Sequence, residues 1–179
     1  MSNYLSNLRH FLYSGIIAVG VWSYSWAANA SESVVLKYRF LRETISVPEL
    51  STFAQTGELS RSLQAYLDLA GKQPEELRTT LTQPISVNGI MLSRILNTPV
   101  GEVMLDRVSE VIHTPTNRAN RQSLRSALVI SALNDNQITL IEILDNYPTA
   151  DVHVEGDRLA DILQQITRLS QGLPPIDLF

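Results

Sequence analysis

Apolar and polar residues first alternate along this chain and then recur with the period of a helix. Apolar side chains occupy every second position from Val34 to Phe40, with Lys37 and Arg39 between them. This two-residue period predicts a strand with one buried face. A return strand over residues 43–47 would complete a small hairpin.

Helix-start and helix-stop signals dominate the chain after this hairpin. Pro48 stands at a first helical position, and Ser46 and Glu49 have the spacing of a reciprocal capping box. Gly57 and Gly71 each end a predicted helix, because glycine readily adopts the left-handed conformation. The second of these helices has a buried stripe of Leu63, Tyr66, Leu67 and Ala70. Further helices are predicted from Pro74, over residues 88–97, 99–112, 124–133 and 138–144, and from Gly156 onward.

Two of these helices carry specific burial predictions. One apolar face of the helix that begins at Pro99 is expected to consist of Val100, Val103, Met104, Val108, Val111 and Ile112. Residues 124–133 are apolar on nearly every side, with Ser126 and Ser131 as the exceptions. We therefore expect this segment to be the central buried helix of the domain.

Three short alternating triplets each lead directly into a predicted helix. They are Ile45–Val47, Ile85–Val87 and Val152–Val154. Together with the first strand, they are expected to form one small sheet covered by helices. The sequence thus predicts a predominantly α-helical α+β fold, a compact bundle of about six to eight short helices with a small sheet or hairpin.

The first thirty residues have the pattern of a secretory signal. Arg9 and His10 precede an apolar run from Phe11 to Trp26, and Ala28 and Ala30 supply the small residues of a cleavage site. The alternative is an uncleaved membrane anchor, but the run has 16 positions and a membrane span needs about 20. We therefore predict a cleavable signal over residues 1–30, a globular domain over 31–171 and a tail over 172–179. Export would lead to the periplasm, the thylakoid lumen or the medium.

Composition removes several classes of function. Cleavage after Ala30 would leave 13 basic and 18 acidic residues, a net charge of −5, which argues against a nucleic-acid-binding protein. The chain has no cysteine, so disulfides, thiolate metal sites and cysteine nucleophiles are excluded. We expect no cofactor and no metal.

The usual patterns of catalytic residues do not stand out in the sequence. It has no G-x-S-x-G string, which a strand-to-helix nucleophile elbow requires. Asp151 and His153 could face the same side of a strand and share a metal or a proton, but an ordinary surface pair is the favoured interpretation. The acidic residues at predicted helix starts, Glu75 and Glu76 and also Asp157 and Asp161, match the helix dipole without any catalytic role. No catalytic residue is predicted.

Two features suggest contact with a partner. Arg118, Arg121 and Arg125 have i, i+3 and i+7 spacing, so on one helix face they could bind an anionic partner, lipid headgroup or phosphate. The alternative is a solvated face on which these arginines pair with nearby carboxylates. In the tail, Ile176, Leu178 and Phe179 are large apolar side chains that we expect to dock on this domain or on a partner.

The mature chain resembles a cyanobacterial family of exported proteins described as alpha/beta hydrolase of unknown function (domain of unknown function 1400). The resemblance covers residues 33–165. It is carried by five stretches, which are Val35–Tyr38, Ile45–Leu67, Leu92–Ile112, Leu124–Leu133 and Ile141–Glu155. In longer members this helical region precedes a catalytic α/β-hydrolase domain, so the resemblance concerns the N-terminal helical region only and transfers no catalytic residue to this chain.

We therefore hypothesise that the protein is an exported, non-catalytic binding or accessory module. Its partner would be a separate hydrolase, an envelope protein or an apolar ligand held between helices, and it would touch a membrane only through an uncleaved signal. The alternatives are a small or split esterase-like hydrolase and a lipid-facing envelope protein.

Overall fold

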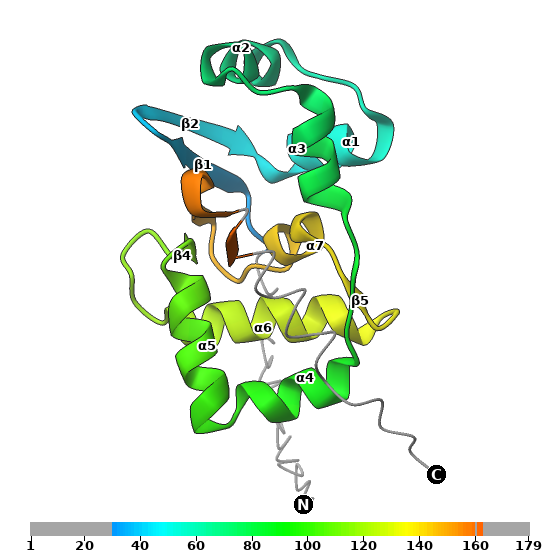
Figure 1. The fold of residues 1–179 in the computed structure, drawn as a ribbon, viewed down its shortest axis with the longest axis vertical. Coiled ribbons are helices and arrows are strands. Elements are labelled where there is room, and N and C mark those ends of the chain that lie inside the picture. The colour runs from blue at the N-terminus through cyan, green and yellow to red at the C-terminus, as the bar shows by residue number, and fades with distance from the viewer. Residues whose placement is uncertain (1–29, 160, 163–179) are drawn as a thin grey trace, which may run out of the picture.

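Alternating strands and capped helices form a helix-dominated α+β fold in the computed structural model, which describes residues 30–159, 161 and 162 (Figure 1). The strands are β1 (Ser33–Tyr38), β2 (Leu41–Ser46), β3 (Ile85–Ser86), β4 (Ile112–His113), β5 (Gln137–Ile138) and β6 (Asp151–Glu155). The helices are α1 (Val47–Thr56), α2 (Arg61–Ala70), α3 (Pro74–Thr82), α4 (Gly89–Leu96), α5 (Pro99–Ser109), α6 (Asn120–Leu133) and α7 (Leu140–Asp145). Residues 156–159, 161 and 162 are also helical.

The main sheet has four strands in the order β2-β1-β6-β4. The predicted hairpin is present, since β1 pairs antiparallel with β2 and Tyr38 lies opposite Leu41. The other edge of β1 pairs in parallel with β6, and β4 then pairs antiparallel with β6. The first and last strands of the described chain are therefore neighbours at the centre of the sheet.

Burial along β1 differs from the prediction of one buried face. Val34 and Val35 are both buried although they point to opposite faces of the sheet. Phe40 was expected to be in the buried row, but it lies in the two-residue turn after β1 and is 88% exposed. The strand ends two residues before Phe40 because Arg39 adopts a left-handed backbone conformation, with φ of 54°.

The three triplets do not collect into a single sheet as expected. Two of them contribute to the main sheet, as parts of β2 and β6, whereas Ile85 and Ser86 pair with β5 in a separate two-stranded sheet. Ile138, at which we expected a helix to begin, belongs instead to the strand β5. This helix, α7, starts instead at Leu140, after Thr139 and Glu142 close a reciprocal capping box.

Helix α6 is only partly the central buried helix that was predicted. It packs against α4, α5 and α7 (Figure 1), and its inner face includes Leu124, Ala127, Leu128 and Ala132. Ile130 and Leu133 of the same helix are exposed, because only one side of α6 faces the core.

The burial prediction for the stripe from Val100 to Ile112 is only partly correct, because Val111 and Ile112 are buried whereas the valines near the start of α5 are not. Val100 and Val103 are exposed, and the buried residues of this helix are Gly101, Leu105 and Ser109. The helix packs through its glycine, so the face with the fewest large side chains is the inner one. Ile112 also leaves the helical stripe, because α5 ends at Ser109 and Ile112 belongs to β4.

Other local signals act as the sequence suggests. Gly57 and Gly71 end α1 and α2 in the left-handed conformation, and Leu159 and Ile162 are buried in the last described helix. The capping box at α1 is only half formed. Ser46 accepts from the Glu49 amide, whereas the Glu49 carboxylate accepts hydrogen bonds from serines near the start of α2. Within the described residues, none of the helices has the length and apolar character needed to cross a membrane.

Candidate functional site

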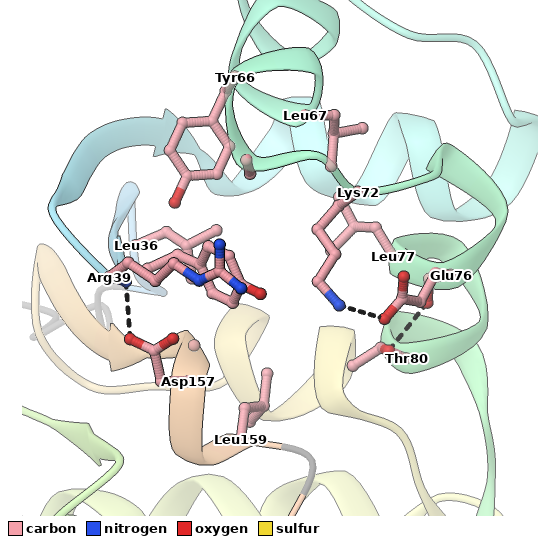
Figure 2. Close-up of a pocket in the computed structure, with 13 residues that line it drawn as sticks. Leu36, Arg39, Tyr66, Leu67, Lys72, Glu76, Leu77, Thr80, Asp157 and Leu159 are labelled. Atoms are coloured by element: carbon pink, nitrogen blue, oxygen red, sulfur yellow. Dashed lines mark hydrogen bonds and ion pairs between the residues drawn. The ribbon is translucent and has the colours of Figure 1, made fainter.

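A cavity of about 270 Å³ lies between the end of the β1–β2 hairpin, helices α2 and α3, and the start of the helix after β6 (Figure 2). Its polar and charged lining residues are Tyr38, Arg39, Tyr66, Lys72, Glu76, Thr80 and Asp157. Its large apolar lining residues, which lie on several sides of it, are Leu36, Leu67, Leu77 and Leu159 (Figure 2). The cavity combines apolar side chains with several converging polar groups, which is the usual composition of a ligand site.

The parallel pairing of β1 with β6 brings two distant parts of the chain to one wall of this cavity. The ladder runs to Lys37 opposite Glu155, so the residues that follow each strand also lie close together. The backbone N–H of Arg39 donates to Oδ2 of Asp157 at 2.7 Å. A glycine precedes Asp157 because a Cβ atom at Gly156 would approach the carbonyl oxygen of Lys37 to 3.0 Å.

Tyr66 supplies a buried hydroxyl from the opposite wall. Helix α2 is capped by Ser60 at one end and Gly71 at the other, which fixes the face that carries Tyr66. The tyrosine is 6% exposed, and its hydroxyl has no hydrogen-bond partner among the described residues. Burial, followed by the charges of Glu43 and Asp157, raises the pKa of Tyr66 to about 12. The hydroxyl is therefore a neutral donor at physiological pH.

Two cations approach the ring of Tyr38. The guanidinium carbon of Arg39 lies 5.3 Å from the ring centroid and Nζ of Lys72 lies 5.6 Å from it, both within the range of cation–π attraction. Lys72 is also paired with Glu76 at 2.6 Å, and this hydrogen bond raises the pKa of Lys72. Within the described part of the chain, the Arg39 guanidinium has no ion pair.

These groups are suited to binding. Figure 2 shows Arg39, Tyr66 and Lys72 entering the cavity from three different segments. The lining hydroxyl of Thr80 is engaged, since it donates to the carbonyl oxygen of Glu76 at 2.8 Å. The lining residues thus present hydrogen-bond donors next to leucine side chains. None of these lining residues is a histidine that could act as a base for a hydroxyl.

The three arginines predicted as a partner site do not share one helix face. Arg118 lies in the loop before α6, which begins only at Asn120. Arg121 pairs with Asp106 and with Glu102, and its hydrogen bond to Asp106 lowers the pKa of that carboxyl group. This corrects the geometry, while binding of an anionic partner by Arg118, Arg121 and Arg125 stays a prediction.

Arg125 has a different role from its two neighbours. Its Nε atom donates to the carbonyl oxygen of Leu96 at 3.0 Å, and its Nη2 atom lies 3.9 Å from a carboxylate oxygen of Glu102. The side chain therefore joins α6 to the ends of the two helices beside it.

Asp151 and His153 have separate partners. Asp151 accepts a hydrogen bond from the Ser33 hydroxyl, whereas the ring of His153 lies edge-on to His113 with 5.3 Å between centroids. His113 in turn has Nε2 at 3.5 Å from Oε1 of Glu155. Among the described residues, no group of three or more histidines and carboxylates is placed to hold a metal ion.

The remaining predicted site residues fall at or beyond the edges of the description. Ala28 and the tail residues Ile176, Leu178 and Phe179 lie outside the described residues, and Ala30 is the first residue inside them. The cavity itself was missed from the sequence. The sequence pattern predicts Tyr66 in a buried helical stripe and Arg39 in a strand. The signal that could have indicated the cavity is a tyrosine at a core position, because its buried hydroxyl needs a partner.

Comparison with known proteins gives one match. Residues 30–155 match the family model described as alpha/beta hydrolase of unknown function, domain of unknown function 1400. No curated protein and no solved structure matches the chain. The matched segment includes every strand of both sheets and the helices α1 to α7.

Proposed function

Since this chain belongs to the family described as alpha/beta hydrolase of unknown function, we propose that it serves as an exported, non-catalytic binding module. The cavity between the hairpin, α2 and α3 holds a small amphiphilic ligand. The module acts beside a hydrolase or an envelope protein.

The observation that carries this proposal is the unsatisfied chemistry of the cavity. A buried tyrosine hydroxyl without a partner lowers the stability of a fold, and Tyr66 has such a hydroxyl. A ligand acceptor in the cavity would pair with the Tyr66 hydroxyl and with the Arg39 guanidinium at the same time. The leucine side chains that line the cavity would contact the apolar part of the ligand.

The non-catalytic part of the proposal is supported by the lining residues. Ester hydrolysis by a serine or threonine needs a hydroxyl with a base in hydrogen-bond reach. Thr80 donates to a backbone carbonyl and Tyr66 has a raised pKa. Neither hydroxyl lines the cavity together with a histidine.

Ligand binding is tested by thermal unfolding of the full chain with small alcohols, carboxylates and amines. We expect at least one amphiphile to raise the melting temperature, and Ala70→Phe to remove this shift because Ala70 lines the cavity. Leu69→Phe is the matched control, since Leu69 precedes Ala70 in α2 and is 72% exposed. Equal shifts in both variants would contradict a ligand in this cavity.

The enzyme alternative is tested with a chromogenic ester. We expect no hydrolysis above that of buffer by the purified chain. Hydrolysis that disappears in His113→Ala or His153→Ala would replace the binding module with a small esterase.

Export is supported by the first thirty residues. We expect the protein recovered from the exported fraction to begin at Ser31, because Ala28 and Ala30 form a cleavage site that ends at Ala30. Intact-mass measurement of that fraction determines the first residue of the protein. A membrane-bound chain that keeps Met1 would support the anchor alternative instead.

The partner part of the proposal rests on the rim of the cavity. Phe40, 88% exposed, follows Arg39 at the hairpin turn, and Leu69 precedes Ala70. Crosslinking with the tagged full chain should recover a protein with a G-x-S-x-G elbow, and Phe40→Ser should reduce that recovery. Undiminished recovery with Phe40→Ser would move the partner contact away from this rim.

A further inference from the structure

Two polar groups that the cavity leaves without a partner, the Arg39 guanidinium and the Tyr66 hydroxyl, can donate hydrogen bonds. Lys72 and Glu76 satisfy each other at 2.6 Å, and one oxygen of Asp157 accepts the backbone N–H of Arg39. The buried Tyr66 hydroxyl has no hydrogen-bond partner among the described residues, and the exposed Arg39 guanidinium lies against the Tyr38 ring without an ion pair to any of them. A ligand that matches the cavity must therefore bring acceptors.

The shape of these donors favours a planar pair of oxygens. A guanidinium group presents parallel N–H bonds that fit the two oxygens of a carboxylate. The face of Tyr38 lies 5.3 Å from the Arg39 guanidinium carbon and orients this plane. Figure 2 shows the Tyr66 hydroxyl directed from α2 toward the side on which Arg39 lies.

The charges around the cavity disfavour a ligand with more than one negative charge. Asp157 and Glu76 both line it, and Glu43 acts on Tyr66 from β2. A dianion such as a phosphate monoester would be repelled by these carboxylates. A ligand with one carboxylate matches the single guanidinium of the lining, that of Arg39, which has no ion pair among the described residues.

The apolar lining and the volume set the rest of the ligand. Four leucine side chains line the cavity around the donors (Figure 2), so a carboxylate that fills it must carry an apolar chain. At about 270 Å³, the cavity is near the lower end of ligand pockets, which span roughly 300 to 1,000 Å³. The chain must accordingly be short.

We propose that this cavity binds a short-chain monocarboxylate. The carboxylate accepts hydrogen bonds from the Arg39 guanidinium and the Tyr66 hydroxyl, and the apolar chain contacts the leucine side chains that line the cavity. This inference rests on the proposed binding function and names its ligand class. A hydrolase that cleaves short acyl esters releases such an acid, so the module would take up the product of that class of reaction.

The test compares three ligands with the same apolar chain on the full chain of the protein. Hexanoate, methyl hexanoate and hexanol are titrated by calorimetry at pH 7, where hexanoate is ionised. We expect hexanoate to bind at least about tenfold more tightly than the other two, because hydrogen bonds to a charged group are the stronger ones. Butyrate should bind roughly fifteenfold more weakly than hexanoate, since each buried methylene contributes about fourfold.

Variants assign this preference to the two donors. Arg39→Gln should weaken hexanoate binding about tenfold or more and leave hexanol unchanged, and Tyr66→Phe should weaken hexanoate about tenfold. Arg42→Gln is the matched control, because Arg42 lies on the same hairpin but outside the cavity lining.

The outcomes separate this inference from the proposed function. If hexanol or the methyl ester binds as tightly as hexanoate, or if Arg39→Gln binds hexanoate normally, the carboxylate site is wrong while the binding module stands. If none of the three ligands binds, the ligand class and the cavity as a binding site both fail.

Discussion

Nε of Arg125 in α6 donates a hydrogen bond to the carbonyl oxygen of Leu96, the last residue of α4, at 3.0 Å. The carbonyl groups at the end of a helix have no partner within the helix. Arg125 supplies one from the neighbouring helix, and α6 is thereby fixed against the junction of α4 and α5.

Arg125→Ala should therefore lower the free energy of unfolding by about 1 to 2 kcal/mol, the range for a hydrogen bond from a charged donor in a partly buried position. Urea denaturation followed by circular dichroism measures this loss. Arg118→Ala is the control, because Arg118 is exposed in a loop, and it should change stability by less than about 0.5 kcal/mol. Equal effects of the two variants would mean that the bond to Leu96 contributes nothing.

Gly101→Ala should destabilise the same junction more strongly. A Cβ atom at Gly101 would lie 2.1 Å from the carbonyl oxygen of Ile95 and 2.6 Å from Cα of Leu96. These are backbone atoms of the preceding helix, so α4 and α5 would have to separate. We expect a loss of more than about 2 kcal/mol in the free energy of unfolding.

The matched control for Gly101→Ala is Val103→Ala in the same helix. Val103 is exposed, so this variant should stay within about 0.5 kcal/mol of the natural protein. A Gly101→Ala protein with an unchanged denaturation midpoint would show that α5 can move without loss of packing.

Tyr66→Phe should leave the protein at least as stable at pH 7, with a gain of up to about 1 kcal/mol in the free energy of unfolding, because it removes a buried hydroxyl without a partner. Burial raises the pKa of Tyr66 to about 12. The folded state then holds this proton more tightly than the unfolded state, whose tyrosines titrate near about 10. The associated stability is present below pH 10 and is lost as the pH rises toward 12.

Denaturant midpoints at pH 7, 10 and 11 check this prediction. The natural protein should lose more stability than Tyr66→Phe between pH 10 and 11. A lower midpoint for Tyr66→Phe at pH 7 would mean that the hydroxyl has a stabilising partner.

The sheet face around His153 should make the fold sensitive to mild acid. Burial, followed by the positive charges of His113, Lys37 and Arg42, lowers the pKa of His153, against the opposing effect of Asp151. The unfolded state therefore binds a proton first as the pH falls. Stability from a neutral His153 is complete above the unfolded pKa of about 6.5 and is lost as the pH falls through the lower folded value.

His153→Gln should flatten the dependence of the melting temperature on pH between 7.5 and 5. Glu155 stays ionised in this window. Burial would raise the pKa of Glu155, but hydrogen bonds from Lys37 and His113 lower it. An unchanged pH profile in His153→Gln would assign the acid sensitivity to other groups.

Signals confined to a few neighbouring residues predicted local structure well. Ser46, Gly57 and Gly71 act at helix ends through their own backbone neighbours, so single-sequence reasoning identifies them. Packing was harder. The α5 stripe of Val100 and Val103 has a helical period, yet the helix turns Gly101 inward, because close approach to α4 decides the orientation.

The cavity could not be predicted from the sequence for a related reason. Arg39 and Asp157 meet only because β1 pairs with β6, and they are 118 positions apart. Tyr66 joins them from a third element. The two-residue strand β4 was likewise taken for the end of a helix, because Ile112 and His113 pair with a strand some forty positions away.

The pairing of β1 with β6 also determines when the fold can be completed. Ser33 lies opposite Asp151, across nearly the whole described chain, and such distant pairing is slow to form. A chain that emerges from a ribosome or passes through a secretion channel presents the hairpin and seven helices before the central partner strand arrives. The four-stranded sheet can close only after residue 155 has emerged, so its completion is a late step in the synthesis of the domain.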